Sequence, residues 1–387
     1  MLDVHQESAR IVPASWADVE PALRSRAFRK RLERALREGQ CTDRMLAEGM
    51  FCAAASTASS AAAPAPFNPL TALPLLKLYL DADTDTHTAT GTAKSGTGDS
   101  ISTSGQTLTD AGQNFNSPTG VSINNALWIG GASNSANNGV FRASTGSAAS
   151  CTYANSAAVN ETSSFGWELM GQLDAATDQV GGYAFTLNGT IATGWACPID
   201  TKTYAPHKYI LNLANQACLL RNDATLAGNW NGNVASYGFV WGRPKDVAAN
   251  QTYRFLAISN GFSGATNCLF LEVIRSSSNT SVRLVHNATA GNTNYSSGTI
   301  VGLSITAPFL FGWNYDGAGN ATLWVNGAQV AAPTGTARAP SGLNYIQIPT
   351  ANTNGPTMTG VVGAGAGAQL TASQWAALYS YLAAKKA

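Results

Sequence analysis

The chain has 387 residues, of which 12% are charged and 44% hydrophobic, and its formal net charge is +1. Charged residues are about half as frequent as in an ordinary globular protein, and a nearly neutral chain does not bind nucleic acid through its overall charge. There is no apolar run of about 18 residues, so we expect no transmembrane helix and no membrane partner. The first thirty residues are too charged to form a secretory signal.

The first fifty residues differ in composition from the rest, because they hold 17 of the 45 charged side chains. Apolar residues recur at helical spacing from Val19 to Leu36, which predicts a helix between Ser15 and Gly39. Basic residues dominate its second half, but only one aromatic residue lies among them, so nucleic-acid binding is disfavoured. We interpret 1–52 as a helical anchor that docks on a partner. The Ala/Ser/Pro-rich segment 53–66 is predicted to be a linker.

From Phe67 onward, short apolar stretches alternate with turns rich in Gly, Asn and Ser. No alternation of strands with long helices appears, so an antiparallel β-sandwich is favoured over a parallel sheet. The predicted strands are 75–82, 239–241, 253–258, 269–274, 282–285, 309–315 and 321–325.

The segment 308–331 gives the clearest local prediction, a meander of three strands. Its second turn, Asn326-Gly327, is a two-residue type that needs positive φ. Near the end of the chain, Thr371 and Gln374 form a capping box that predicts a helix. The apolar face of this helix consists of Trp375, Leu378, Tyr379 and Leu382.

Three parts of this body resemble one family. The strand at Leu70–Thr84, the block FLFGWNYDGAGNATLWVNG and the closing LTASQWAALYSYLAAKK are similar to a concanavalin A-like, laminin-G-type module. The resemblance covers 67–387 and implies a mainly β fold, a concanavalin A-like sandwich with a C-terminal helix. Modules of this family are common on tailed-phage virions, at the neck or collar, tail and capsid surface.

The segment 95–165 has a different texture and resembles small β modules of phage tail and baseplate proteins. We therefore predict it as an insertion, which leaves 67–94 and 166–387 for the sandwich. Leu127, Ile129, Val140 and Phe141 are predicted to fill its minor core.

Residues for catalysis are sparse. A glycosidase needs two carboxyl groups flanking the sugar bond, yet Glu272 has no second acid within twenty residues on either side. The four histidines show no metal-binding spacing, and no nucleophile elbow is present. The glycines at Gly363, Gly365 and Gly367 lack a dinucleotide-binding context and predict a closely packed strand instead. We expect no enzyme activity.

Asp81, Asp83 and Asp85 alternate in LDADTDT, a pattern whose oxygens can ligate calcium. Thr86 and Thr92 stand where an EF-type loop needs Gly and Glu, so a solvated turn is the alternative. Apart from this calcium site, no cofactor is expected.

The six cysteines contain no C-x-x-C pair, which argues against structural zinc. Cys151, Cys197, Cys218 and Cys268 are predicted to be small buried residues. Cys41 and Cys52 flank a short predicted helix near the linker, and we expect them to form intermolecular disulfides.

Two aromatic residues, Trp230 in AGNWNGN and Tyr295 in NTNYSSG, lie in polar surroundings typical of loops. Exposed Trp and Tyr stack on sugar rings, so these two are candidates for glycan contact, with burial of Trp230 as the alternative.

The preferred interpretation is a non-enzymatic structural protein of a tailed-phage virion. Its N-terminal helices would bind other virion proteins, and the particle would impose a homo-oligomer. The alternative is a glycan-binding adhesin that recognises sugars of the host envelope, which the same fold also permits. A polysaccharide-cleaving enzyme is the third hypothesis, and it requires two carboxylates converging in one cleft.

Overall fold

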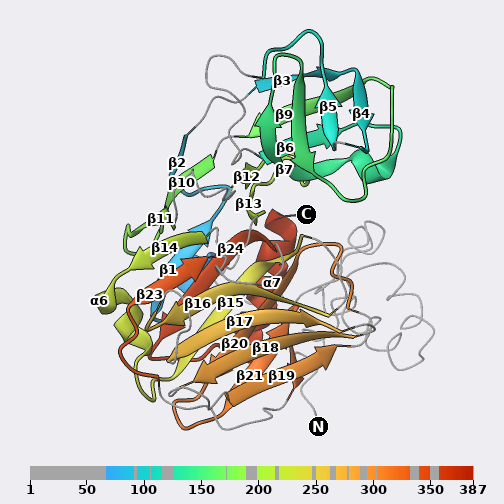
Figure 1. Ribbon diagram of the computed structural model, residues 1–387. Coiled ribbons are helices and arrows are strands. Elements are labelled where there is room, and N and C mark those ends of the chain that lie inside the picture. The colour runs from blue at the N-terminus through green and yellow to red at the C-terminus, as the bar shows by residue number, and fades with distance from the viewer. Residues whose placement is uncertain are drawn as a thin grey trace, which may run out of the picture. The chain divides into compact units, whose positions relative to one another are not determined.

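The structure is a computed structural model, shown in Figure 1. It describes residues 67–90, 94–104, 106–115, 126–170, 172–188, 198–213, 218–245, 250–261, 267–276, 279–287, 294–300, 303–331, 340–348 and 357–386. The predicted anchor at 1–52, the linker at 53–66, Cys41 and Cys52 lie outside the described residues. The chain divides into two units, Met1–Pro66 and Phe67–Ala387, and the fold belongs to the second.

The first sheet, called sheet A here, has eight antiparallel strands in the order β12, β13, β24, β15, β20, β21, β22. The remaining strand, β1, pairs with β24 on the edge that β13 also uses. The strands are β1 (Leu76–Asp81), β12 (Ile199–Asp200), β13 (Tyr209–Asn212), β15 (Ser236–Pro244), β20 (Phe309–Tyr315), β21 (Ala321–Val325), β22 (Ala328–Ala331) and β24 (Thr357–Ala366).

The second sheet, sheet B, has nine antiparallel strands in the order β19, β18, β17, β16, β23, β14, β11, β10, β2. Figure 1 shows β16 to β19 side by side. The strands are β2 (His87–Thr90), β10 (Gln172–Thr177), β11 (Ala184–Asn188), β14 (Cys218–Asn222), β16 (Gln251–Ser259), β17 (Cys268–Arg275), β18 (Thr280–Asn287), β19 (Asn294–Ile300) and β23 (Tyr345–Ile348).

Sheets A and B share one large apolar core, as expected of a β-sandwich. The rings of Phe255 on β16 and Phe311 on β20 meet edge to face, with centroids 4.9 Å apart. Alternate residues of β20, from Phe309 to Tyr315, all enter this core, as their spacing predicts. The predicted antiparallel β-sandwich is confirmed.

Sheet A is buried on its outer face as well, because the C-terminal helix α7 (Ala372–Lys385) packs there. Trp375 of α7 stacks on Trp324 of β21, with ring centroids 5.5 Å apart and planes 6° from parallel. The predicted capping box is present, since Thr371 Oγ1 accepts from the Gln374 N–H and Gln374 Oε1 accepts from the Thr371 N–H. Among the described residues, no helix is long and apolar enough to cross a membrane.

Glycines let this outer face pack closely. A Cβ on Gly312 of β20 would lie 2.5 Å from the Trp375 ring and 2.2 Å from the Gly238 carbonyl oxygen. A Cβ on Gly363 of β24 would lie 2.3 Å from the Phe239 ring. The glycine-rich segment near the C-terminus is thus a central strand, as predicted, and not a dinucleotide loop.

The meander prediction is also confirmed. Between β21 and β22, Asn326 and Gly327 adopt φ angles of 48° and 80°, the positive values that a two-residue hairpin turn requires. Short helices complete the sandwich and module: α5 (Pro69–Ala72), α6 (Ala224–Ala227), η1 (Ser135–Asn137) and η3 (Gly228–Trp230).

A third sheet of seven strands forms the inserted module, in the order β3, β9, β6, β7, β8, β5, β4. The strands are β3 (Lys94–Gly98), β4 (Ser100–Ser102), β5 (Thr107–Thr109), β6 (Ala126–Gly130), β7 (Gly139–Gly146), β8 (Ser150–Ala154) and β9 (Phe165–Met170).

The core of this module contains Leu127 and Ile129, as predicted, and Phe141 packs against its edge. Val140 belongs elsewhere, because it packs with Leu211 and Met358 of sheet A. The sequence prediction was therefore wrong for Val140, which joins the module to the sandwich.

Candidate functional site

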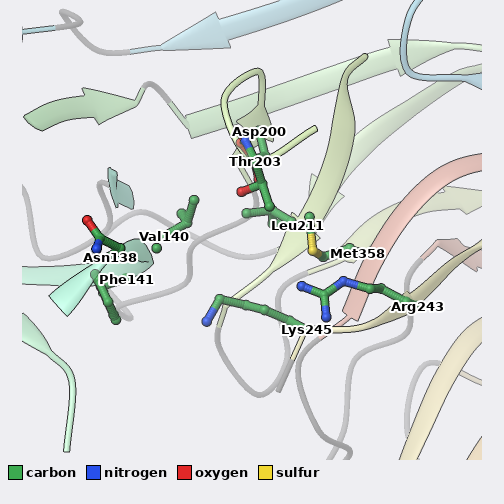
Figure 2. Close-up of a pocket in the computed structure, with 10 residues that line it drawn as sticks. Asn138, Val140, Phe141, Asp200, Thr203, Leu211, Arg243, Lys245 and Met358 are labelled. Carbon is green, nitrogen blue, oxygen red and sulfur yellow. The ribbon is translucent and has the colours of Figure 1, made fainter. Parts of the chain in front are cut away.

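A pocket of about 200 Å³ lies between the module and the outer face of sheet A, and we call it the seam pocket (Figure 2). Strand register builds its floor, because Leu211 and Arg243 both pair with Met358. Side chains of directly paired residues stand on the same face, so these three form a row across β13, β24 and β15. The lining residues are Asn138, Gly139, Val140, Phe141, Asp200, Thr203, Leu211, Arg243, Lys245 and Met358.

The module supplies the opposite wall through the start of β7. Asn138 is held rigidly, since its amide accepts from the Ala132 N–H at 2.8 Å and donates to the Ala132 carbonyl at 2.9 Å. The Lys245 ammonium lies 5.9 Å from the centre of the Phe141 ring. Figure 2 shows Asn138 and Phe141 across the space from Arg243 and Lys245.

Asp200, at the end of β12, contributes a buried carboxylate, of which only one oxygen accepts hydrogen bonds. The residue is 1% exposed. Its Oδ1 accepts from the Lys202 and Thr203 N–H groups at 2.8 and 3.0 Å, which fixes the carboxylate in the turn. Its Oδ2 is buried and has no hydrogen-bond partner. An unsatisfied buried oxygen costs about 1–3 kcal/mol.

In contrast to Asp200, Arg243 has a hydrogen-bond donor without a partner. Its Nε is buried without a hydrogen-bond partner. The guanidinium carbon lies 5.7 Å from the centre of the Tyr204 ring, a cation–π contact. Within the described chain, no ion pair or hydrogen bond to Arg243 is found, although the residue lines the pocket.

Contacts beside the pocket link the inserted module to the turn that follows β12. Lys202, two residues after Asp200, forms an ion pair with Glu168 of β9 at 2.8 Å. The same ammonium lies 5.5 Å from the centre of the Trp128 ring of β6. These contacts and the apolar packing of Val140 stabilise the module against sheet A.

The module carries a second, more open hollow of about 380 Å³. All seven lining side chains are uncharged: Thr103, Ser104, Gln106, Ser144, Thr152, Tyr153 and Ala154. Several hydroxyls here bind each other, as Ser144 and Thr152 do at 2.7 Å. This hollow lacks the opposed charges of the seam pocket.

Two carboxylates of a kind that a hydrolase would use form ion pairs in the structure. Glu272 is fully buried between two arginines, Arg254 on β16 and Arg283 on β18, with Nε atoms 2.7 and 2.8 Å from its oxygens. Asp223 caps α6 and pairs with Arg221 at 2.6 Å. Both carboxylates are therefore engaged in ion pairs within the fold.

The three aspartates predicted as calcium ligands lie at the end of β1, where lysines from the end of α7 bind them. The Lys386 ammonium, whose side chain is 0% exposed, donates to Asp81 Oδ1 at 2.9 Å and to Asp83 Oδ2 at 2.6 Å. Lys385 also binds Asp81. We call this group the C-terminal latch. No cluster of three His, Cys, Asp or Glu side chains suited to a metal is found in the described part of the chain.

Burial and charge shift the pKa values within the latch. Burial alone would raise the pKa of Asp83, but hydrogen bonds from Lys386 and the Lys208 N–H lower it below its ordinary value. Burial raises the pKa of Asp85 to about 7, although a hydrogen bond from Gln179 opposes the shift. The sequence prediction of a solvated turn at Asp81 was wrong, because this residue is 0% exposed.

One of the two aromatic candidates for glycan contact is buried in the sandwich. Trp230 is 2% exposed, and its Nε1 donates to the Gly365 carbonyl at 3.2 Å inside the sandwich core. A buried indole cannot stack on a sugar, so this prediction was wrong. Tyr295 lies in β19, paired with Val285 of β18.

Two cysteines match their predicted burial. Cys151 and Cys268 are buried free thiols, and burial raises the pKa of each to about 12. Cys197 lies outside the described residues.

Sequence reasoning missed Asp200, Arg243 and Lys245 as site residues. Asp200 and Arg243 lie far apart in the chain and carry no motif, and only the pairing of β13, β24 and β15 brings their strands together. The one available signal was a charged residue inside an apolar strand, as Arg243 is in FVWGRP.

No protein-family model and no curated protein matches the sequence. Partly similar solved structures include botulinum neurotoxin type C, with 12% identity and a TM-score of 0.38 over 54% of this chain and 49% of that chain. Another is the Ruminococcus gnavus IT-sialidase CBM40 with α2,3-sialyllactose, with 11% identity and a TM-score of 0.36 over 43% and 94%.

The chain spans about half the length of the neurotoxin chain that it matches. Entry of that neurotoxin into cells is described as dependent on two ganglioside molecules. All these overlays are partial, with TM-scores below 0.5, so the assignment of a β-sandwich rests on the sheets themselves.

Proposed function

We propose that this chain is a non-catalytic carbohydrate-binding protein and that the seam pocket receives the sugar. One observation carries the proposal: Asp200 and Arg243, a carboxylate and a guanidinium, line the same pocket, and each has one buried polar atom without a hydrogen-bond partner. A sugar hydroxyl donates one hydrogen bond and accepts others, so neighbouring hydroxyls of a sugar ring can bind both a carboxylate and a guanidinium.

The size and lining of the pocket agree with a small polar ligand. Pockets for drug-sized ligands have volumes of about 300–1,000 Å³, whereas the seam pocket has about 200 Å³, which suits a single sugar ring at the end of a glycan. Leu211, Val140 and Met358 give the apolar surface on which the less polar face of such a ring can lie.

A glycan array with neutral and acidic saccharides, followed by titration calorimetry on the binders, tests this proposal. We expect a dissociation constant of about 1 mM or tighter, and about tenfold weaker binding by Asp200→Asn, whose amide cannot accept from a hydroxyl at that position. Thr103→Val, in the second hollow, is the matched control and should bind as the unmodified protein does. Failure of every sugar to bind, or normal binding by Asp200→Asn, would refute the proposal.

The absence of catalysis is part of the same proposal, and the engagement of Glu272 and Asp223 in ion pairs supports it. Any glycan that binds should therefore be recovered intact. Release of reducing ends during prolonged incubation with the protein would contradict this.

We further propose that the sandwich is displayed on a tailed-phage virion, as a homo-oligomer held by its N-terminal helices. The family resemblance and the nearly neutral composition support this setting, because low charge permits dense packing of copies. Intermolecular disulfides at Cys41 or Cys52 belong to the same proposal. Low-resolution imaging of the particle tests the location, and non-reducing electrophoresis that shows only monomer would exclude the disulfides.

A further inference from the structure

We infer that the C-terminal latch is a site of covalent modification, at which the side chains of Lys386 and Asp83 condense to an amide (isopeptide) bond. The bond ties the end of helix α7 to the turn that follows β1. The inference is independent of the proposed carbohydrate binding. It follows from a lysine amine buried against two carboxylates, together with neighbouring groups suited to each step of the condensation.

The nucleophile is the amine of Lys386. Its side chain is 0% exposed, and Nζ lies 2.6 Å from Asp83 Oδ2 and 2.9 Å from Asp81 Oδ1. Lysine is rarely so completely enclosed, and an amine removed from water is a better nucleophile toward carbonyl carbon. Because the fold holds the reacting groups in contact, the entropy of bringing them together has already been lost on folding.

The carboxyl group of Asp83 is held as an electrophile. Its Oδ1 accepts from the Lys208 N–H at 2.6 Å, so this N–H stabilises the negative charge that develops on Oδ1 when nitrogen attacks Cγ. Its Oδ2, the leaving oxygen, lies 3.1 Å from Nδ1 of His207. The His207 side chain is 19% exposed, so it can take a proton from solvent and give it to Oδ2. Each oxygen of Asp83 therefore has the partner that its part in the reaction requires.

Asp81 is the base, because its buried Oδ1 accepts from Lys386 Nζ. The ammonium first passes one proton to Asp83 Oδ2, which leaves a neutral amine beside a carboxylic acid. The nitrogen lone pair then bonds to Asp83 Cγ, and Asp81 takes a second proton from nitrogen. His207 protonates Oδ2, the Cγ–Oδ2 bond breaks with its electron pair on oxygen, and water leaves. Asp81 then loses the proton it took and His207 regains one, so the condensation balances without an oxidant or co-reactant.

The resting latch is the ion pair. Burial alone would raise the pKa of Asp83, but hydrogen bonds from Lys386 and the Lys208 N–H lower it, so most molecules hold the charged pair. Burial narrows the free-energy gap to the neutral pair, because buried charges have lost their hydration. The neutral pair is the minor state that reacts, so the amide should accumulate slowly in the folded protein. Freshly purified protein should contain mainly the ion pair.

Mass spectrometry of the full-length chain, denatured before and after the folded protein is incubated for several days, tests the inference. The intact mass should fall by one water molecule. Trypsin cleaves after Lys77, Lys94 and Lys385, so the digest should contain peptide 78–94 joined to 386–387. Fragmentation of this branched peptide should place the link at Asp83. A succinimide also loses water but joins no two peptides.

Variants assign the roles. Lys386→Met and Asp83→Ala should abolish the link, and Asp81→Asn should slow its formation by about a hundredfold, as expected for loss of a general base. Asp83→Asn, which is nearly isosteric, should still form the link but release ammonia in place of water. Lys385→Met is the matched control and should form the link as the unmodified protein does. Thermal melting of each variant confirms that the protein is folded.

The outcomes are distinct. If neither the unmodified protein nor Asp83→Asn yields the branched peptide, the latch is an ion pair only and the inference is wrong. A link through Asp81 or through Lys385 would overturn the assignment of electrophile or nucleophile. An undiminished rate in Asp81→Asn would refute the role of Asp81 as the base. None of these results depends on whether a sugar binds.

Discussion

Removal of the Lys386 ammonium should destabilise the protein strongly. In the C-terminal latch, this group is enclosed, bonded to Asp81 Oδ1 at 2.9 Å and to Asp83 Oδ2 at 2.6 Å. Asp81 is itself 0% exposed, so Lys386→Met leaves a buried carboxylate with less compensation. Breaking a buried ion pair costs about 3–5 kcal/mol. We expect the lower end, about 3 kcal/mol, because Lys385 still binds Asp81.

Urea denaturation of the full-length chain, followed by tryptophan fluorescence, measures this free energy of unfolding. At about 2 °C per kcal/mol for a large domain, the midpoint of thermal unfolding should fall by about 6 °C. Lys385→Met is the matched control, because this side chain is 26% exposed and water solvates part of its charge, whereas the side chain of Lys386 is 0% exposed. Its loss should be less than half as large.

A double-mutant cycle isolates the pair itself. Lys386→Met combined with Asp81→Asn should cost less than the sum of the two single changes, with a coupling energy above about 1 kcal/mol. Equal losses for Lys386→Met and Lys385→Met, or additive effects in the cycle, would refute the argument that the latch is a buried ion pair.

Three further predictions concern stability and packing. Burial raises the pKa of Asp85 to about 7, so the folded state keeps a proton that the unfolded chain releases near pH 4. The free energy of unfolding should therefore fall as pH rises from about 4 to about 7. Asp85→Ala should reduce this dependence in urea titrations at pH 5 and 8. Gly312→Ala should cost about 1–3 kcal/mol, because its Cβ would meet the Trp375 ring, whereas Gly166→Ala, with its nearest atom at 3.5 Å, should change the denaturation midpoint little. Trp230→Ala should lower the free energy of unfolding by about 3–5 kcal/mol, because this side chain lies in the core. Trp230→Phe should leave glycan affinity unchanged. A Trp230 variant that loses glycan affinity without losing stability would contradict this assignment.

Local patterns predicted much of the sandwich correctly. The alternation from Phe309 to Tyr315, the Asn326-Gly327 turn and the Thr371 capping box each concern residues within a few positions of one another. Strand periodicity, turn conformation and helix capping are short-range properties, so one sequence suffices to predict them.

Predictions about exposure failed where distant parts of the chain meet. Trp230 lies among Asn and Gly residues, yet it donates to Gly365, which is 135 positions away. Asp81 begins an acidic, turn-like segment, yet Lys386, 305 positions away, binds it. Polar neighbours in sequence indicate exposure only when no other segment covers the residue.

The amino-acid sequence by itself determined the antiparallel strands, the hairpin turns and the C-terminal helix, because backbone preferences and side-chain periodicity act over a few residues. The tertiary structure alone decided the seam pocket. Its floor depends on the register that aligns Leu211, Met358 and Arg243, and its wall depends on the docking of β7 through Val140. Which charges end without partners is a property of that packing, since pairing requires proximity in space.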